Sequence, residues 1–445
     1  MEFVKEAAKV VPSENQLRWF EMEQYAFIHF GVNTYTGKQW GDGKESESIF
    51  NPVKLNCDQW VEAIKAAGLK GMVLTAKHHD GFCLWPSAYT EHSVKNSPCP
   101  YDIVKEASDA CRRGGIPFGF YLSPWDRNSK YYGTADYNDY YCNQLTELLT
   151  GYGEIFYVWF DNACSEEGKQ SYDFPWYFEL IRKYQPKAVI FNDFGPDIRW
   201  CGNEAGKGRE AEWAVVPTDL CRNAASQTQP GPDFVSKLSL HNWDQDLGER
   251  QQILRSSGLA FVPSEIDTSI RKDWFWLRRQ NPKSLRKLLK IYLNSVGHNA
   301  CLHLNVPPTK EGLIDKRDVK RLKAYGALLE KCFSYPLEVA QREKGGEILL
   351  ELPCAVKDVA FVTLREDLTQ GQRIESFEIL SGDRILYQGK TVGNKQICCL
   401  RDPFALLHPK LWGLGDENRL RIRITSSRDV PALKPVLVYG KEKIR

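Results

Sequence analysis

Four short apolar runs in the first 160 residues each lead into a side chain that can donate, accept or exchange a proton. These side chains are His29, the pair His78 and His79, Tyr121 and Asp161. A single His or Asp at the end of a strand more often caps the strand than works in a site. If the runs are parallel strands of one barrel, however, their carboxyl ends meet at a common rim. We therefore expect these five side chains to converge on one pocket.

The spacing of the residues argues against several kinds of site. A hydrolytic zinc centre uses closely spaced ligands such as His-x-His on a strand or His-Glu-x-x-His on a helix, and neither pattern occurs. There is no Gly-x-Ser-x-Gly elbow, which argues against a serine hydrolase. Residues 206–211 match Gly-x-Gly-x-x-Ala by letter, but no strong strand of a βαβ unit precedes them, so we discount a dinucleotide site. We expect no metal and no cofactor.

Carboxylate chemistry among aromatic residues and histidines remains, and it suits the hydrolysis of glycosides. That reaction uses two carboxyl groups that flank the glycosidic bond. Asp161 is the candidate nucleophile, because it follows a buried strand beside Trp159. Two residues are about equally supported as the acid/base. Glu265 ends an apolar run, whereas Glu204 lies in a glycine-flanked loop where Trp200 can desolvate the carboxyl group and raise its pKa.

Alternating strands and helices supply the frame for these residues. Apolar runs of four to eight residues, rich in Val, Ile, Phe or Tyr, are typical of strands that are buried on both faces. They lie at 25–30, 71–76, 116–122, 154–160, 187–192, 259–265 and 301–305. Asp102 caps one amphipathic helix, and Ser284 begins another that ends at Gly297.

This repetition predicts a (β/α)8-like, TIM-type barrel over residues 1–333. The alternative is an open doubly wound sheet, which would show a phosphate-binding fingerprint after its first strand. Residues 30–33, Phe-Gly-Val-Asn, offer none.

The sequence changes in character after residue 333. Alternating or apolar runs of strand length lie at 347–352, 359–364, 376–380, 396–400, 419–425 and 436–439. Glycine-containing segments between them supply turns. We expect residues 334–445 to form a C-terminal all-β sandwich domain, joined to the barrel by a linker around 330–336. We favour a purely structural role for this domain over sugar binding.

Composition limits the partners and the compartment. The 59 Lys and Arg residues nearly balance 57 Asp and Glu residues, so the net charge of +2 argues against nucleic acid or an acidic membrane as a partner. No run approaches the eighteen apolar residues of a membrane-spanning helix. The first fifteen residues lack the apolar core of a signal peptide. The thirteen cysteines form no C-x-x-C pair, and we expect reduced thiols in the cytoplasm.

The tryptophans are concentrated in the first two-thirds of the chain. All except Trp412 lie between Trp19 and Trp276. Packing of a large core accounts for many of them. Their distribution also suits a site that needs flat, amphipathic surfaces, as sugar-binding sites do.

Several of these segments resemble glycoside hydrolase family 29, the retaining α-L-fucosidases. The motifs are Phe27-Ile28-His29-Phe30-Gly31, Lys77-His78-His79-Asp80-Gly81-Phe82, Trp159-Phe160-Asp161 and Leu304-Asn305-Val306-Pro307-Pro308. The resemblance extends from about Trp19 to Ile314 and returns in the tail at 364–367 and 371–374. One departure is Asn162, which follows the candidate nucleophile where many relatives have Gly, and which puts the adjacent subsite in doubt.

The resemblance implies a fold, an activity and a set of roles. It implies an exo-acting α-L-fucosidase that works by double displacement, with Asp161 as the nucleophile. Segment 202–206 resembles the acid/base loop of the branch that cleaves α-1,3 and α-1,4 linkages, subfamily B, which favours Glu204 over Glu265. Residues implied to bind fucose are His29, Trp40, His78, His79, Tyr121 and Trp159. In the same branch, Glu265, Arg271 and Trp274 are expected to contact the sugars beyond the fucose.

The expected substrate is therefore a fucosylated oligosaccharide or glycoconjugate of the Lewis type. One alternative is a broad-specificity α-L-fucosidase that also cleaves α-1,2 and α-1,6 linkages. Another is a non-catalytic protein that binds fucose or other glycans, against which the presence of both Asp161 and Glu204 argues. The sequence does not indicate an oligomeric state.

Overall fold

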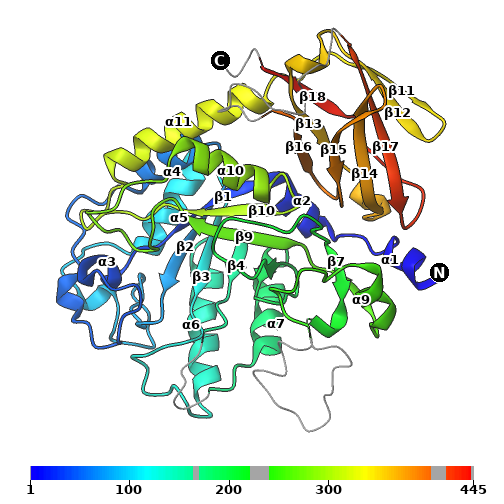
Figure 1. The fold of residues 1–445 in the computed structure, drawn as a ribbon. Coiled ribbons are helices and arrows are strands. Elements are labelled where there is room, and N and C mark those ends of the chain that lie inside the picture. The colour runs from blue at the N-terminus through cyan, green and yellow to red at the C-terminus, as the bar shows by residue number, and fades with distance from the viewer. Residues whose placement is uncertain (1, 164–169, 221–239, 402–416, 442–445) are drawn as a thin grey trace.

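The computed structural model describes residues 2–163, 170–220, 240–401 and 417–441, so that Trp412 lies outside the described residues. Eight parallel strands form a barrel in the order β5-β4-β3-β2-β1-β10-β9-β6 (Figure 1). They are β1 (Gln24–Ile28), β2 (Met72–Lys77), β3 (Phe118–Leu122), β4 (Ile155–Trp159), β5 (Val189–Phe191), β6 (Arg199–Trp200), β9 (Ser264–Ser269) and β10 (Cys301–Asn305). A parallel bridge between Phe191 and Ile198 nearly closes the ring. The predicted TIM-type barrel is confirmed.

Helices cover the outside of this barrel (Figure 1). The longer ones are α4 (Cys57–Ala66), α5 (Ile103–Gly114), α6 (Tyr137–Gly151), α7 (Phe174–Tyr184), α10 (Leu285–Ser295) and α11 (Lys316–Phe333). Shorter ones are α1 (Glu2–Ala7), α2 (Glu14–Met22), α3 (Val32–Thr36) and α9 (Arg250–Arg255). At α5, the side chain of Asp102 accepts a hydrogen bond from the Lys105 amide at 3.0 Å, and Gly115 ends the helix with φ of +67°. The predicted Asp cap is therefore confirmed at the start of this helix, and a left-handed Gly ends it.

Side chains alternate along the barrel strands and divide the core into two layers. Tyr25 and Phe27 of β1 and Tyr157 and Trp159 of β4 belong to a cluster inside the barrel. The residues between them pack in a second cluster with the surrounding helices. Because alternate residues of a strand share a face, Asp161 is the next inward-facing position after Trp159. It therefore emerges at the carboxyl end of β4.

The predicted strand at 259–265 is wrong in its bounds. The chain forms two strands there, separated at Pro263: β8 (Leu259–Phe261) and β9. β8 pairs antiparallel with β7 (Val215–Pro217) in a small sheet of its own, and only β9 enters the barrel. Glu265 is consequently the second residue of β9 rather than the end of a strand.

Two antiparallel sheets follow the barrel. One has five strands in the order β11-β12-β17-β14-β15 and the other has three in the order β16-β13-β18 (Figure 1). They are β11 (Ala340–Lys344), β12 (Glu347–Glu351), β13 (Val359–Leu364), β14 (Ile374–Ser381), β15 (Arg384–Gly389), β16 (Gln396–Cys399), β17 (Arg419–Ser427) and β18 (Leu437–Gly440). A shared apolar core contains Phe377 and Ile422 of the first sheet and Val362 and Val438 of the second. This arrangement confirms the predicted sandwich, to which the structure adds β11 and β15.

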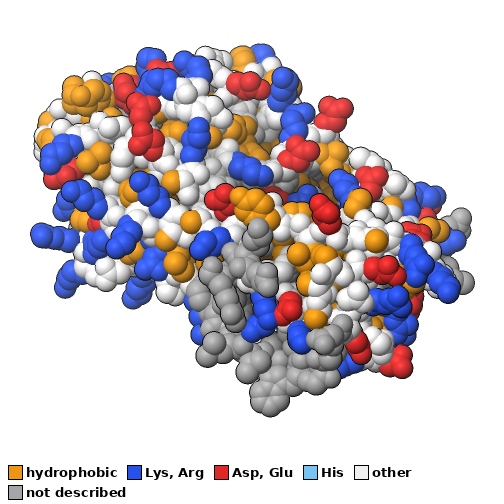
Figure 2. Space-filling model, turned by 90° about the horizontal axis from the view of Figure 1, so that it is seen from above, with side chains coloured by type: hydrophobic (Ala, Val, Ile, Leu, Met, Phe, Trp, Pro, Cys, Tyr) orange, Lys and Arg blue, Asp and Glu red, His pale blue; other side chains and the backbone are white. Residues whose placement is uncertain are grey.

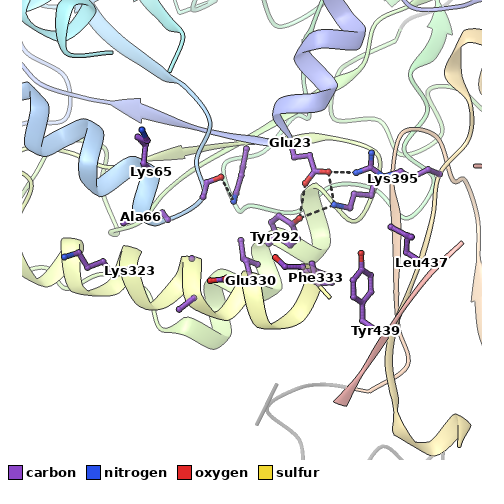
Figure 3. A pocket seen from close by; sticks show the side chains of 18 residues that line it. Glu23, Lys65, Ala66, Tyr292, Lys323, Glu330, Phe333, Lys395, Leu437 and Tyr439 are labelled. Atoms are coloured by element: carbon purple, nitrogen blue, oxygen red, sulfur yellow. Dashed lines mark hydrogen bonds and ion pairs between the residues drawn. The ribbon is translucent and has the colours of Figure 1, made fainter. Parts of the chain in front are cut away.

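Glu23 connects the barrel to these sheets (Figure 3). Its carboxylate forms ion pairs with Arg365 and with Lys395, the latter at 2.8 Å, and accepts a hydrogen bond from Tyr292 at 3.2 Å. Burial opposes the charge, but the neighbouring cations outweigh it and hold the pKa of Glu23 below its ordinary value. A cavity of about 750 Å³ adjoins these residues. The two parts of the chain are thus joined by a charged contact at the end of the barrel from which β1 starts.

Charged side chains of both signs lie on the face of the molecule seen in Figure 2. Acidic and basic side chains are interspersed over much of this face. Within the described ranges, no helix has both the length and the apolar character needed to cross a membrane.

Candidate active site

Asp161 is held at the barrel rim by two hydrogen bonds. Its Oδ2 accepts from the Tyr121 hydroxyl at 3.0 Å, and its Oδ1 accepts from the Ala163 amide at 2.8 Å. The side chain is 27% exposed, so one side of the carboxylate faces open space. Burial raises the pKa of Asp161 above its ordinary value, and the hydrogen bonds from Ala163 and Tyr121 oppose that rise. The carboxyl ends of β3 and β4 therefore bring Tyr121 and Asp161 together, as expected.

His79 lies beside this carboxylate, with Nε2 at 3.7 Å from Asp161 Oδ2. Its Nδ1 is 2.7 Å from Ser123 Oγ, and Ser123 Oγ donates its own proton to the Trp125 carbonyl at 2.7 Å. Because the hydroxyl proton is used there, Ser123 accepts from Nδ1–H of His79. Burial lowers the pKa of His79 to about 3, so the ring is neutral and Nε2 is left as an acceptor.

His29, which directly follows β1, repeats this arrangement. Its Nδ1 is 3.0 Å from Asn305 Oδ1, while Asn305 Nδ2 donates to Ser269 Oγ at 2.9 Å and to the Trp274 carbonyl at 2.8 Å. The amide oxygen must therefore accept from Nδ1–H, which leaves Nε2 of His29 as an acceptor. Burial also lowers the pKa of His29 well below its ordinary value. The site thus contains two neutral rings, each with a fixed orientation.

Three further residues that the sequence predicted lie around Asp161 and the two histidines: His78, Trp159 and Trp40. His78 stacks near Tyr121, with ring centroids 5.7 Å apart, and burial lowers its pKa well below the ordinary range. Trp159 stacks on Phe191 at 4.2 Å inside the barrel. Trp40 is 58% exposed, and its ring meets that of His79 at 5.4 Å edge to face. The site consequently combines polar groups with aromatic rings that lie beside them.

Glu204 approaches from the loop that follows β6. Positive φ values at Gly202 and Gly206, +88° and +70°, allow this loop to turn tightly on either side of it. The side chain is exposed, and Trp274 Nε1 donates to its Oε2 at 3.2 Å. Partial burial and the charge of Asp161 raise the pKa of Glu204, and the hydrogen bond from Trp274 opposes them.

Glu265 occupies a different environment from the one expected. It is fully buried in the barrel interior and accepts hydrogen bonds from the hydroxyls of Tyr25 and Tyr157. Trp159 Nε1 donates to it at 2.8 Å, and His303 Nδ1 lies 3.1 Å away. Burial opposes the charge, yet these partners hold its pKa below the ordinary value. The structure therefore does not place Glu265 where an acid/base or a contact with an outer sugar is needed.

Arg271 is likewise buried rather than presented to the pocket. Its guanidinium pairs with Asp318 at 2.7 Å and with Asp315 at 3.1 Å, and its side chain is fully buried. An arginine held in this way supports the segment after β9 and has no surface to offer an outer sugar. Trp274, the third residue of the expected wall, does lie at the site beside Glu204.

The structure adds polar residues that the sequence reasoning did not single out. Asp193 follows β5, and burial together with the charge of Asp161 raises its pKa to about 8. Asp267 of β9 accepts a hydrogen bond from Trp200 Nε1 at 2.8 Å, so the indole N–H of Trp200 is directed at this carboxyl group. Burial and the charges of Glu265 and Glu204 raise the pKa of Asp267 well above its ordinary value. Asp193 lies two residues beyond the end of β5, so a search for polar side chains after every predicted strand would have included it.

No group of three or more His, Cys, Asp or Glu side chains suited to a metal ion occurs in the described part of the chain. The described site brings together carboxyl groups, neutral imidazoles and hydroxyls. A raised pKa at Glu204 favours proton donation, and an anchored Asp161 favours attack or activation of water.

Comparison with known proteins identifies the family of this chain. The family model described as Alpha-L-fucosidase matches residues 6–332. The chain belongs to the α-L-fucosidase family. The resemblance that its motifs indicate is thereby confirmed. The activity of the chain is the hydrolysis of α-L-fucosides.

The relatives of this α-L-fucosidase family member include a plant protein and bacterial structures. Alpha-L-fucosidase 1 of Arabidopsis thaliana is 40% identical over 432 residues, which cover 87% of this chain and 81% of the relative. A glycoside hydrolase 29 family member from an unknown rumen bacterium is 35% identical with a TM-score of 0.84, over 97% of this chain and 78% of the other. The Ruminococcus gnavus GH29 fucosidase, solved in complex with fucose, is 28% identical with a TM-score of 0.82, over 98% and 96% of the two chains.

Proposed function

We propose that the chain is a retaining exo-α-L-fucosidase that removes α-1,3- and α-1,4-linked fucose from Lewis-type glycans. The observation that carries this proposal is the pairing of an anchored carboxylate, Asp161, with a second carboxyl group, Glu204, whose pKa is raised in part by the charge of the first. Two carboxyl groups with different environments are what a glycosidase needs for its nucleophile and its acid.

In the first step, Asp161 attacks the anomeric carbon while Glu204 protonates the departing oxygen. The two hydrogen bonds to Asp161 support this role, because they fix the carboxylate while leaving it partly open. Glu204 begins protonated, and the bond from the anomeric carbon to the leaving oxygen breaks as the bond to Asp161 forms. The product of this step is a covalent fucosyl-enzyme.

In the second step, Glu204 accepts a proton from water as the water attacks the anomeric carbon and releases Asp161. Two inversions give overall retention. This mechanism requires the two carboxyl groups to stand about 5–5.5 Å apart during the reaction.

The neutral histidines support binding of a sugar with several hydroxyl groups. The fixed orientations of His29 and His79 leave the Nε2 lone pair of each ring free to accept a hydrogen bond from a hydroxyl. We propose that these two rings and His78 bind fucose hydroxyls, and that Trp40 and Trp159 pack against the apolar parts of the sugar, its methyl group included. The linkage preference rests on the likeness of segment 202–206 to the acid/base loop of subfamily B.

Hydrolysis of a Lewis-type trisaccharide followed by ¹H NMR tests this proposal. The expected result is release of fucose whose first-formed anomer has the α configuration of the substrate, before mutarotation sets in. Appearance of the β anomer first would overturn the retaining mechanism. Assays on α-1,2- and α-1,6-linked fucosides test the broad-specificity alternative, and absence of hydrolysis on every fucoside would favour a protein that only binds glycans.

A further inference from the structure

Two tryptophans stand out from the rest by their exposure. Of the twelve within the described residues, only Trp40 and Trp243 are exposed, at 58% and 55% respectively. Trp40 lies beside His79 and is part of the site described above. Trp243 has no place in the mechanism proposed so far. An exposed indole ring offers a flat apolar surface with one N–H donor, which is suited to contact with a ligand.

The backbone around Trp243 lies between two elements of the active-site rim. On one side, a Cβ added at Gly202 would lie 2.6 Å from the Trp243 Cα, so this backbone contacts the loop that bears Glu204. On the other, Asn242 Nδ2 donates to the carbonyl of Asp193 at 3.5 Å, just beyond β5. The charge of Asp161 raises the pKa of both Asp193 and Glu204. The Trp243 segment therefore borders the pocket on the side of the proposed acid/base, where the leaving group departs.

This segment is rigid at its base. Arg209, which is buried and paired with Glu212 at 3.1 Å, donates to the carbonyl of Asp244 at 2.6 Å and also to that of Asn242. The Asp244 amide donates to the His241 carbonyl at 3.0 Å and closes a turn. A segment fixed in this way loses little conformational freedom when a ligand binds.

The ring of Trp243 is also held in place. His241 stacks on it with centroids 4.5 Å apart and planes inclined by 15°, and so covers one face. Trp243 nevertheless stays 55% exposed, so a large part of its surface remains accessible to a ligand. A flat apolar surface with a polar edge, ordered before binding, is suited to the apolar face of a pyranose ring.

We propose that Trp243 is a stacking platform for a sugar ring of the leaving group, a neutral hexose or N-acetylhexosamine attached to the fucose. This inference rests on the proposed function, because it assumes that an oligosaccharide leaves past Glu204. It assigns the outer sugar a contact on the Glu204 side of the pocket, where Glu265 and Arg271 provide none.

A comparison of two substrates tests the platform. Trp243→Ala should lower kcat/KM about tenfold on the oligosaccharide fucoside that the wild-type chain hydrolyses fastest. On α-L-fucosyl fluoride the fall should be less than twofold, because fluoride carries no sugar that can reach the platform. Trp243→Phe, which keeps a flat apolar ring, should retain most of the activity on the oligosaccharide. Leu254→Ala on α9 removes a side chain of the same exposure, 55%, and should change neither rate.

The outcomes separate this inference from the proposed function. Equal losses on both substrates would overturn it, because they would place Trp243 in support of the Glu204 loop. An unchanged rate of Trp243→Ala on the oligosaccharide would overturn it as well. Failure of the wild-type chain to hydrolyse α-1,3- or α-1,4-linked fucose would count against the linkage preference, while the platform would still be measured on the fucoside that is cleaved. Far-UV circular dichroism and the fluoride rate report whether each variant is folded.

Discussion

Two carboxylates of the barrel, Asp161 at the rim and Glu265 in the interior, have opposite environments. Glu265 has partners on both oxygens from two tyrosines, a tryptophan and a histidine, and they hold its pKa low. Asp161 receives one hydrogen bond on each oxygen, remains partly exposed, and has a raised pKa. The number of donors around the carboxylate, rather than burial alone, therefore separates a structural group from a reactive one.

This difference has a physical basis. A carboxylate whose lone pairs are all satisfied is too stabilised to attack carbon and has no room for a substrate, but it fixes the strands that supply its donors. Trp159 links the two regions, because its ring lies below the pocket while its Nε1 donates to Glu265. The interior carboxylate thereby orients an aromatic ring of the site without entering the chemistry.

Replacement of the rim carboxylate should have the largest effect. Asp161→Asn keeps the shape of the side chain and removes the nucleophile, so we expect kcat on a Lewis-type trisaccharide to fall by about 10⁴-fold or more. The melting temperature should stay near that of the wild type or rise, because the burial cost of a charge is removed. Steady-state kinetics and thermal unfolding measure the two quantities. Substantial hydrolysis by this variant would remove Asp161 from its role.

The second prediction distinguishes the two candidate acids. Glu204→Ala should lower kcat by about 10²–10³-fold on the trisaccharide and much less on fucosyl fluoride, whose leaving group needs little protonation. Azide should restore turnover of the fluoride and give a fucosyl azide, because it replaces water without needing a base. Product analysis by mass spectrometry detects the azide. If Glu265→Ala shows this pattern and Glu204→Ala does not, the acid/base is Glu265.

The sequence predicted the rim more completely than the interior. Strands β1 to β4 are apolar on both faces, which makes each of them recognisable. The residues in or just after their carboxyl ends could therefore be predicted by position: His29, His78, His79, Tyr121 and Asp161. The predicted barrel and sandwich followed from the same periodicity.

Strand β9 was not recognised, because its sequence is polar although all six of its residues are buried. Glu265 and Asp267 are compatible with burial only through hydrogen bonds from tyrosine, tryptophan and histidine side chains on other elements. A single sequence does not reveal such pairings, since each partner is remote along the chain. Strand β11 escaped detection for a different reason: it is an exposed edge strand whose residues carry no apolar alternation.

The third prediction concerns the stability conferred by the interior carboxylate. Glu265→Gln replaces a charged acceptor by an amide whose NH2 group faces donors, so the free energy of unfolding should fall by about 3 kcal/mol near neutral pH. Because the pKa of Glu265 is lowered in the folded state, its stabilising contribution is present above the unfolded pKa and is lost as the pH falls through the folded value. The difference between wild type and variant should therefore shrink in acid. Urea unfolding at several pH values measures it, and an equal difference at every pH would contradict the assignment.

The smallest expected effect is a shift in the pH profile, caused by the hydrogen bond that Trp274 donates to Glu204. This bond stabilises the carboxylate and so lowers the pKa of Glu204, against burial and the charge of Asp161. Trp274→Phe removes the donor and should therefore raise that pKa, so that the acid stays protonated to higher pH and the alkaline limb of kcat/KM moves upward. The acid limb, set by Asp161, should stay where it is. Trp276→Phe is the matched control, because Trp276 Nε1 donates to Asp315 at 3.1 Å instead. A downward shift, or the same shift in both variants, would show that Trp274 does not set the proton affinity of the acid and that the rim carboxyl groups are tuned by burial alone.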